Sequence, residues 1–379
     1  MVKKVKEKKN DINLILLLFP VLIILGKVIR WTILKSVLVD MSIGNSMINI
    51  ILHSTRGFTS FAETGVSDAA GNAAVFFRIF NIFNLTNTKQ FEIYISVIWN
   101  LILFLIIIKN SDIILTDIQL FFLSISIIVL NIWDFCLAKE PLQFIFFLVI
   151  YLILKKNNLT YIKKYIYILL TLFISILYYR VYYVLIVAFL IIITILCEKY
   201  LKSKEKITKN EVFKLLLLLV SIYFVMLISI KLIDKDSFNE LIRVRTRSGE
   251  AHTQMINIFK SSNIFIFCID YLIMIIRMLI PVELIPMSIK YWPYVFYQIL
   301  ITYFIVKSII NIKSNTKEEN LSLYIYLAFL LGSAAFEPDF GSWVRHEATV
   351  FPILLIITKT IKIQEGVILN EENNIENNG

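Results

Sequence analysis

The sequence predicts an all-α membrane protein: a polytopic bundle of about ten transmembrane helices, with re-entrant or interfacial helices in the outer loops. Of its 379 residues, 58% are hydrophobic and only 17% are charged, and the mean hydropathy is +0.77. A water-soluble domain of this length is far less apolar. Lysines cluster beside the apolar runs, so the net charge of +10 is first a topology signal, and we expect no nucleic-acid partner.

The spans follow from apolar runs of roughly 17 to 22 residues, the length that crosses a bilayer. The lysine-rich start resembles the first part of a signal peptide, but the apolar run after it lacks a small-residue cleavage site, so we expect a retained first span. The predicted spans are 13–34, 91–109, 115–133, 141–155, 161–179, 181–197, 211–232, 293–311, 320–336 and 347–362.

Charge assigns the two faces. If alternate spans reverse direction, all lysine clusters fall on one side, which the positive-inside rule places in the cytoplasm together with both termini. Segment 264–281 is apolar, but counting it as a full crossing would invert this bias, so we treat it as re-entrant or oblique. We expect one transmembrane domain, 1–365, and a disordered polar cytoplasmic tail, 366–379.

The densest polar stretch is 337–347, between the last two apolar runs. So many charges beside hydrocarbon need water, a ligand or each other. Pro338 is expected to end the ninth span, so the stretch forms a polar connection to the last one. The alternative is an internally paired polar cap on a helical hairpin. Its candidate catalytic and binding residues are Glu337, Asp339, Arg345 and His346.

Arginines in the outer loops are candidates for binding an anion. Arg243, Arg245 and Arg247 alternate with uncharged residues, so in an extended segment their guanidiniums face one way, which suits a pyrophosphate. A solvated arginine patch is the alternative. Arg180 lies between two apolar spans and Arg277 lies in the apolar segment 264–281, where each is costly unless it faces protein, water or ligand.

Carboxylates elsewhere are candidates for a general base. Glu63 and Asp68 lie among small residues in the first outer loop, which would allow a bulky ligand to approach. Glu140 begins the fourth span, where the helix dipole favours a negative charge, so it fits a structural role as well as a catalytic one.

Motifs for cofactors are missing from the sequence. Cys136, Cys197 and Cys268 are far apart and have no histidine at ligand spacing, so we expect neither a disulfide framework nor a zinc site. No glycine-rich nucleotide motif occurs either, and we expect no cofactor.

Two local patterns carry a resemblance to a known family. The first is AKEPLQF at 138–144 followed by YRVYY at 179–183, and the second is FEPDFGSWVRH at 336–346 followed by Pro352. Together with the topology they resemble the Wzy-like polymerases of bacterial capsule, exopolysaccharide and O-antigen, a GT-C type of integral-membrane glycosyltransferase.

The resemblance implies an enzyme that polymerises undecaprenyl-diphosphate-linked oligosaccharides on the outer face of the bacterial cytoplasmic membrane. Arginines would hold the pyrophosphate, and one of the acids or His346 would take the proton from the acceptor hydroxyl. The implied partners are the lipid-linked donor and acceptor, membrane lipid, a flippase and a chain-length regulator. The alternatives are a GT-C transferase that adds one sugar from a polyprenyl-phosphate donor, and a flippase for lipid-linked oligosaccharide.

Overall fold

The structure, a computed structural model, describes residues 14, 17–33, 40–64, 68–109, 116–198, 223–224, 253–259, 263–337 and 339–358. Within these ranges the chain is helical and has no strand; an isolated bridge joins Gln254 to Asp339. The chain divides into two compact units. The first unit comprises 1–181 and 345–379, and the second comprises 182–344.

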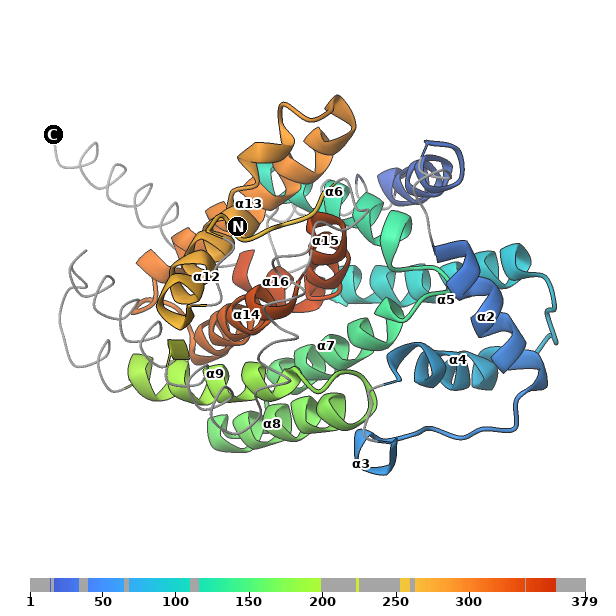
Figure 1. Cartoon of the computed structure of the whole chain (residues 1–379), viewed down its shortest axis with the longest axis horizontal. Helices are drawn as coiled ribbons and strands as arrows, with labels where there is room; N and C mark the ends of the chain where they lie inside the picture. Colours follow the sequence, from blue (N-terminus) through green and yellow to red (C-terminus); the bar gives the residue numbers. More distant parts are fainter. Residues whose placement is uncertain are drawn as a thin grey trace, which may run out of the picture. The chain divides into compact units, whose positions relative to one another are not determined.

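The first unit begins with the N-terminal helix, residues 17–33, whose last turn is the π-helical segment η1 (Ile29–Ile33). Helix α7 packs against α8, α16 and α4, and α4 also packs against α2 (Figure 1). The other helices of this unit are α2 (Asp40–His53), α3 (Phe61–Thr64), α4 (Ala69–Phe80), α5 (Thr88–Lys109), α6 (Asp117–Trp133), α7 (Glu140–Lys155), α8 (Tyr161–Tyr178) and α16 (Phe351–Ile357).

The second unit is built on α14, which packs along α9 and also contacts α12 and α13 (Figure 1). A Cβ atom on Gly332 would lie 2.7 Å from Cγ1 of Ile186, so this glycine lets α14 and α9 approach closely. The helices of this unit are α9 (Tyr183–Leu196), α12 (Ile264–Leu279), η3 (Val282–Leu284), η4 (Ile289–Tyr291), α13 (Trp292–Ile310) and α14 (Lys317–Phe336).

Helix starts follow local chemistry. Thr116 and Thr316 each form a capping box, accepting a bond from the backbone N–H three residues on, while that residue's side chain bonds back to the threonine N–H. Pro141 lies in the first turn of α7, where its missing N–H has no partner to lose.

The helices agree with a membrane protein. α5, α8, α13 and α14 are long and apolar enough to cross a bilayer, and they coincide with four predicted spans. The all-helical prediction is therefore confirmed for the described ranges. The larger number of spans and the sides of the termini stay predictions. The predicted span 211–232 (except 223–224), the three arginines at 243–247 and the tail 366–379 lie outside the described residues.

The C-terminal stretch differs from the sequence prediction in one respect. We expected a polar connection over 337–347 and then one continuous span, 347–362. Instead, α15 (Phe340–Ala348) occupies most of the connection, and α16 follows after a break. Pro352 explains the break, because it has no N–H to donate to the carbonyl of Ala348 in a continuous helix.

Candidate functional site

The turn between α6 and α7 places two carboxylates inside the first unit. Asp134 follows the last residue of α6, and Glu140 is the first residue of α7, just ahead of its apolar run. Their exposed fractions are 0% and 1%. Such complete burial of two acids in one short turn is costly unless other groups compensate their charge.

Helix α15 supplies a compensating group from far along the chain. Nε2 of His346 lies 3.8 Å from Oε1 of Glu140, and both side chains are buried. We call Asp134, Glu140 and His346 the acid–histidine cluster. Arg345, the half-buried neighbour of His346, contributes positive charge to both acids.

A chain of hydrogen bonds fixes α15 against α7 at this point. Nε2 of Gln143 donates to the carbonyl of His346 at 3.4 Å, and the hydroxyl of Tyr179 donates to Oε1 of Gln143 at 2.9 Å. The hydroxyl of Thr349 donates to the same carbonyl at 2.6 Å. His346 is therefore held beside Glu140 by residues that are themselves buried.

The two acids are driven in opposite directions. Burial, and then the negative charge of Glu140, raise the pKa of Asp134 well above its usual value. Burial also acts to raise the pKa of Glu140, but the charges of Arg345, His346 and Lys139 outweigh it and the pKa lies below its usual value. One carboxyl of the pair therefore holds its proton to higher pH than usual, and the other stays ionised to lower pH than usual.

Asp134 also stands out by its hydrogen bonding. Within the described ranges, neither of its carboxylate oxygens has a hydrogen-bond partner, although both are buried. Buried acids without hydrogen bonds are rare in folded proteins. Such an acid is explained by a functional role or by an additional partner such as water or substrate.

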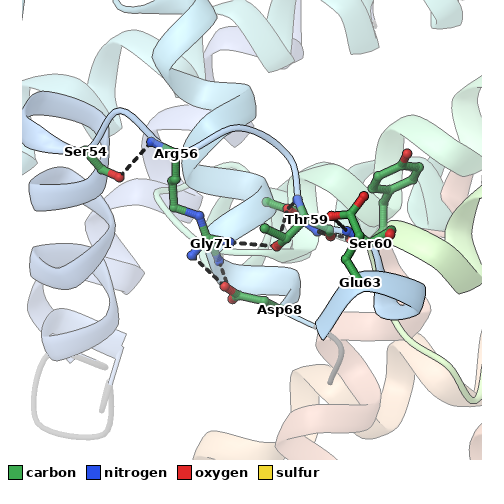
Figure 2. Close-up of polar contacts among 9 residues, drawn as sticks. Ser54, Arg56, Thr59, Ser60, Glu63, Asp68 and Gly71 are labelled. Carbon is green, nitrogen blue, oxygen red and sulfur yellow. Dashed lines mark hydrogen bonds and ion pairs between the residues drawn. The ribbon is translucent and has the colours of Figure 1, made fainter. Parts of the chain in front are cut away.

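Asp68, a predicted base, has a structural task at the start of α4, in the segment predicted to be an outer loop (Figure 2). Its Oδ2 lies 2.7 Å from Nη1 of Arg56, and its Oδ1 accepts the backbone N–H of Gly71 at 2.8 Å, which caps α4. Arg56 also donates to the hydroxyl of Thr59 at 2.8 Å. Glu63, the second predicted base here, is exposed and accepts the N–H of Ser60 at 3.3 Å.

Arg277 of the second unit, a predicted ligand-binding residue, is engaged within the protein. Its Nε and Nη2 form a bidentate pair with Glu283, with distances of 2.6 to 3.0 Å, and its Nη1 donates to the carbonyl of Ile256 at 2.8 Å. Phe340 lies under the guanidinium, 6.0 Å away. The costly charge in the apolar segment is thus compensated by protein groups.

Glu337 and Asp339 hold the start of α15. Oε2 of Glu337 accepts the hydroxyl of Ser342 at 2.7 Å, and Oδ1 of Asp339 accepts the backbone N–H of Ser342 at the same distance. These contacts agree with the alternative of an internally paired polar cap for this half of the stretch.

Of the other predicted binding residues, Arg180 is half-buried, with its guanidinium 5.6 Å from the ring of Tyr179. In the first unit the structure thus brings together Glu140, Arg345 and His346. Sequence reasoning did not select Asp134, Gln143 or Tyr179 as site residues, although all three flank or lie within the segments that carry the resemblance.

The cluster can accept and donate protons beside a positive charge in a place shielded from water. Among the described residues, no group of three or more His, Cys, Asp or Glu side chains is arranged to hold a metal ion. Comparisons with protein-family models, with curated proteins and with solved structures found no match to this chain.

Proposed function

We propose that this protein is a membrane glycosyltransferase that polymerises polyprenyl-diphosphate-linked oligosaccharides on the extracytoplasmic face of the bacterial cytoplasmic membrane. The observation that supports this most is the acid–histidine cluster with Arg345, which lies at the ends of apolar helices. Proton transfer and stabilisation of negative charge are the two tasks that this transfer reaction requires.

The reaction needs no external energy source. A hydroxyl oxygen of the acceptor glycan forms a bond to the anomeric carbon of the donor, and the bond from that carbon to the diphosphate oxygen breaks. The diphosphate leaves with the bonding electron pair and remains on its polyprenyl chain. The hydroxyl proton passes to a base on the enzyme.

The pair of Glu140 and His346 is the best candidate for this base. Glu140 alone is a weak base, because its pKa is lowered, but it stays ionised and would stabilise the positive charge that His346, 3.8 Å away, gains with the proton. Glu63 is exposed, and Asp68 is engaged with Arg56 and Gly71, so these two acids fit the role less well.

Positive charge for the leaving diphosphate comes from Arg345 in this proposal. Arg180, of the same unit as Arg345, is proposed to bind the same group, and Arg243, Arg245 and Arg247 are proposed to bind an anionic part of the lipid-linked substrate. Arg180 lies in the YRVYY pattern, and the other three form the alternating arginine series of the large outer loop.

The test is the Glu140→Gln variant in the native host, with lipid-linked glycans separated by size. If the variant inserts normally, long chains should vanish and single repeat units should accumulate outside the membrane. The matched control is Glu63→Gln, which removes an exposed acid and should leave chain length unchanged.

Other outcomes separate the rival functions. Accumulation of units on the cytoplasmic face in Glu140→Gln would identify a flippase. Loss of activity in Glu63→Gln or Asp68→Asn alone would favour a transferase that adds one sugar from a polyprenyl-phosphate donor. Unchanged glycans in Glu140→Gln would reduce the cluster to a structural element.

A further inference from the structure

The N-terminal helix reaches directly to the turn that carries the acids of the cluster. A Cβ atom on Gly26 would lie 2.7 Å from Cβ of Asn131 and 3.0 Å from the carbonyl oxygen of Ile128, both on α6. Only a glycine allows the two helices to approach this closely without a shift of the neighbouring atoms. The close approach places the next turn of the N-terminal helix beside the end of α6.

Two cations of this helix bind the end of α6 and the turn after it. Nζ of Lys27 donates to the carbonyl of Phe135 at 2.5 Å, and Nη1 of Arg30 donates to the carbonyl of Ile132 at 2.7 Å. These two carbonyls flank Asp134 in the sequence. Both cations are buried, with exposed fractions of 7% and 6%.

The contacts satisfy carbonyls that the end of a helix leaves without intrahelical partners, and the positive charges oppose the negative end of the α6 dipole. Arg30 also donates from Nε to Oε1 of Glu92 at 2.7 Å, so it joins α5 to the same place. A buried turn in an apolar surrounding would lose this geometry without such donors.

We propose that Lys27 and Arg30 are positioning residues of the acid–histidine cluster, so that the N-terminal helix is a working part of the site rather than only a membrane anchor. This inference rests on the proposed function for its catalytic meaning. The structural part of the inference is that the two cations fix the position of Asp134 and influence its protonation. This part can be tested without any glycan.

Asp134 is faced by charges from several elements. Lys27 and Arg30 of the N-terminal helix and Arg345 of α15 favour its ionised form, whereas Glu140 of α7 opposes it. Glu92 of α5 pairs with Arg30. Removing a cation at 27 or 30 should therefore let Asp134 keep its proton to higher pH.

The experiment is an infrared pH titration of the full-length protein in lipid. The carbonyl band of protonated Asp134 is assigned by its loss in Asp134→Asn. Lys27→Gln keeps a hydrogen-bond donor but has no charge. In this variant the midpoint, meaning the pH at which half of the band is lost, should rise by about one pH unit. Lys27→Arg should restore the midpoint, and Lys163→Met, an exposed lysine on α8, should not move it.

A second variant covers Arg30. Arg30→Gln is made together with Glu92→Gln, so that the half-buried carboxylate of Glu92 is not left without its cation, and a smaller upward shift is expected because loss of the Glu92 charge partly offsets loss of the Arg30 charge. An unchanged midpoint in both the Lys27 and the Arg30 variants would overturn the proposal. The length of the glycans made in the native host should also fall with Lys27→Gln and recover with Lys27→Arg. A shifted midpoint with unaffected glycans would keep the structural inference and reject its catalytic meaning.

Discussion

Nε2 of His346 lies 3.8 Å from Oε1 of Glu140, and these two residues of the first unit come from different helices, α15 and α7. Both side chains are buried, and hydrogen bonds from Gln143 and Thr349 hold the backbone of His346 in place. The pair is therefore built by long-range packing, and it is the contact on which the proposed chemistry depends.

Replacement of either member should remove the function of the pair. We expect Glu140→Gln and His346→Asn each to lower the rate of polymerisation by about 10²–10⁴-fold, the usual contribution of acid–base catalysis. If the two residues act as one unit, the double variant should be no slower than the worse single variant. The polymerisation rates of the wild type, the two single variants and the double variant, measured on lipid-linked glycan in membranes, form a double-mutant cycle. If the activation free energies lost in the two single variants add up in the double variant, a joint role is contradicted.

The two acids should lose their protons at different pH. The pKa of Asp134 is raised, so it is protonated below that value and loses the proton only as pH rises through it. The pKa of Glu140 is lowered, so it is ionised above that value and takes up a proton only at acid pH. In an infrared pH titration, the protonated-carboxyl band that is missing in Asp134→Asn should therefore disappear at higher pH than the band that is missing in Glu140→Gln. The reverse order would contradict the electrostatics described here.

Gly71 leaves room for the ion pair between Asp68 and Arg56 at the start of α4. A Cβ atom there would lie 2.3 Å from Oδ2 of Asp68 and 2.6 Å from Nη1 of Arg56, so Gly71→Ala must disturb their ion pair (Figure 2). Both side chains are partly exposed and their ends can move, so we expect a loss of no more than about 1 kcal/mol in the free energy of unfolding. Thermal unfolding in detergent measures it. The control is Gly57→Ala, since a Cβ atom on Gly57 meets nothing within 4 Å.

Asp270 should govern the mobility of segment 253–259. Its Oδ1 accepts the backbone N–H groups of Ile258 at 3.0 Å and Phe259 at 3.3 Å, and its exposed fraction is 2%. We expect Asp270→Ala to speed hydrogen exchange at these two amides, because they lose their acceptor. Asp270→Asn keeps one acceptor oxygen and should have a smaller effect. Equal exchange in wild type and Asp270→Ala would show that these bonds are not formed in solution.

Much of the fold could be predicted from the sequence, because its determinants are local. An apolar run of bilayer length has few alternatives to a helix, and threonine or proline at the first turn sets where several helices begin. Helix α14 ends at Phe336, two residues before Pro338, as a proline at that position predicts. The location of charged loops likewise follows from composition alone.

The tertiary structure decided which polar groups act together. Charged residues that look alike as candidates in the sequence have different surroundings in the structure. Asp68 caps a helix, Arg277 pairs with Glu283, and Glu140 belongs to a buried cluster. Periodicity and composition report the environment along one helix, whereas the pairing of Glu140 with His346, the burial of Asp134 and the reach of Lys27 depend on how helices distant in sequence pack. Only that packing removes water from these groups, and removal of water strengthens the interactions between their charges.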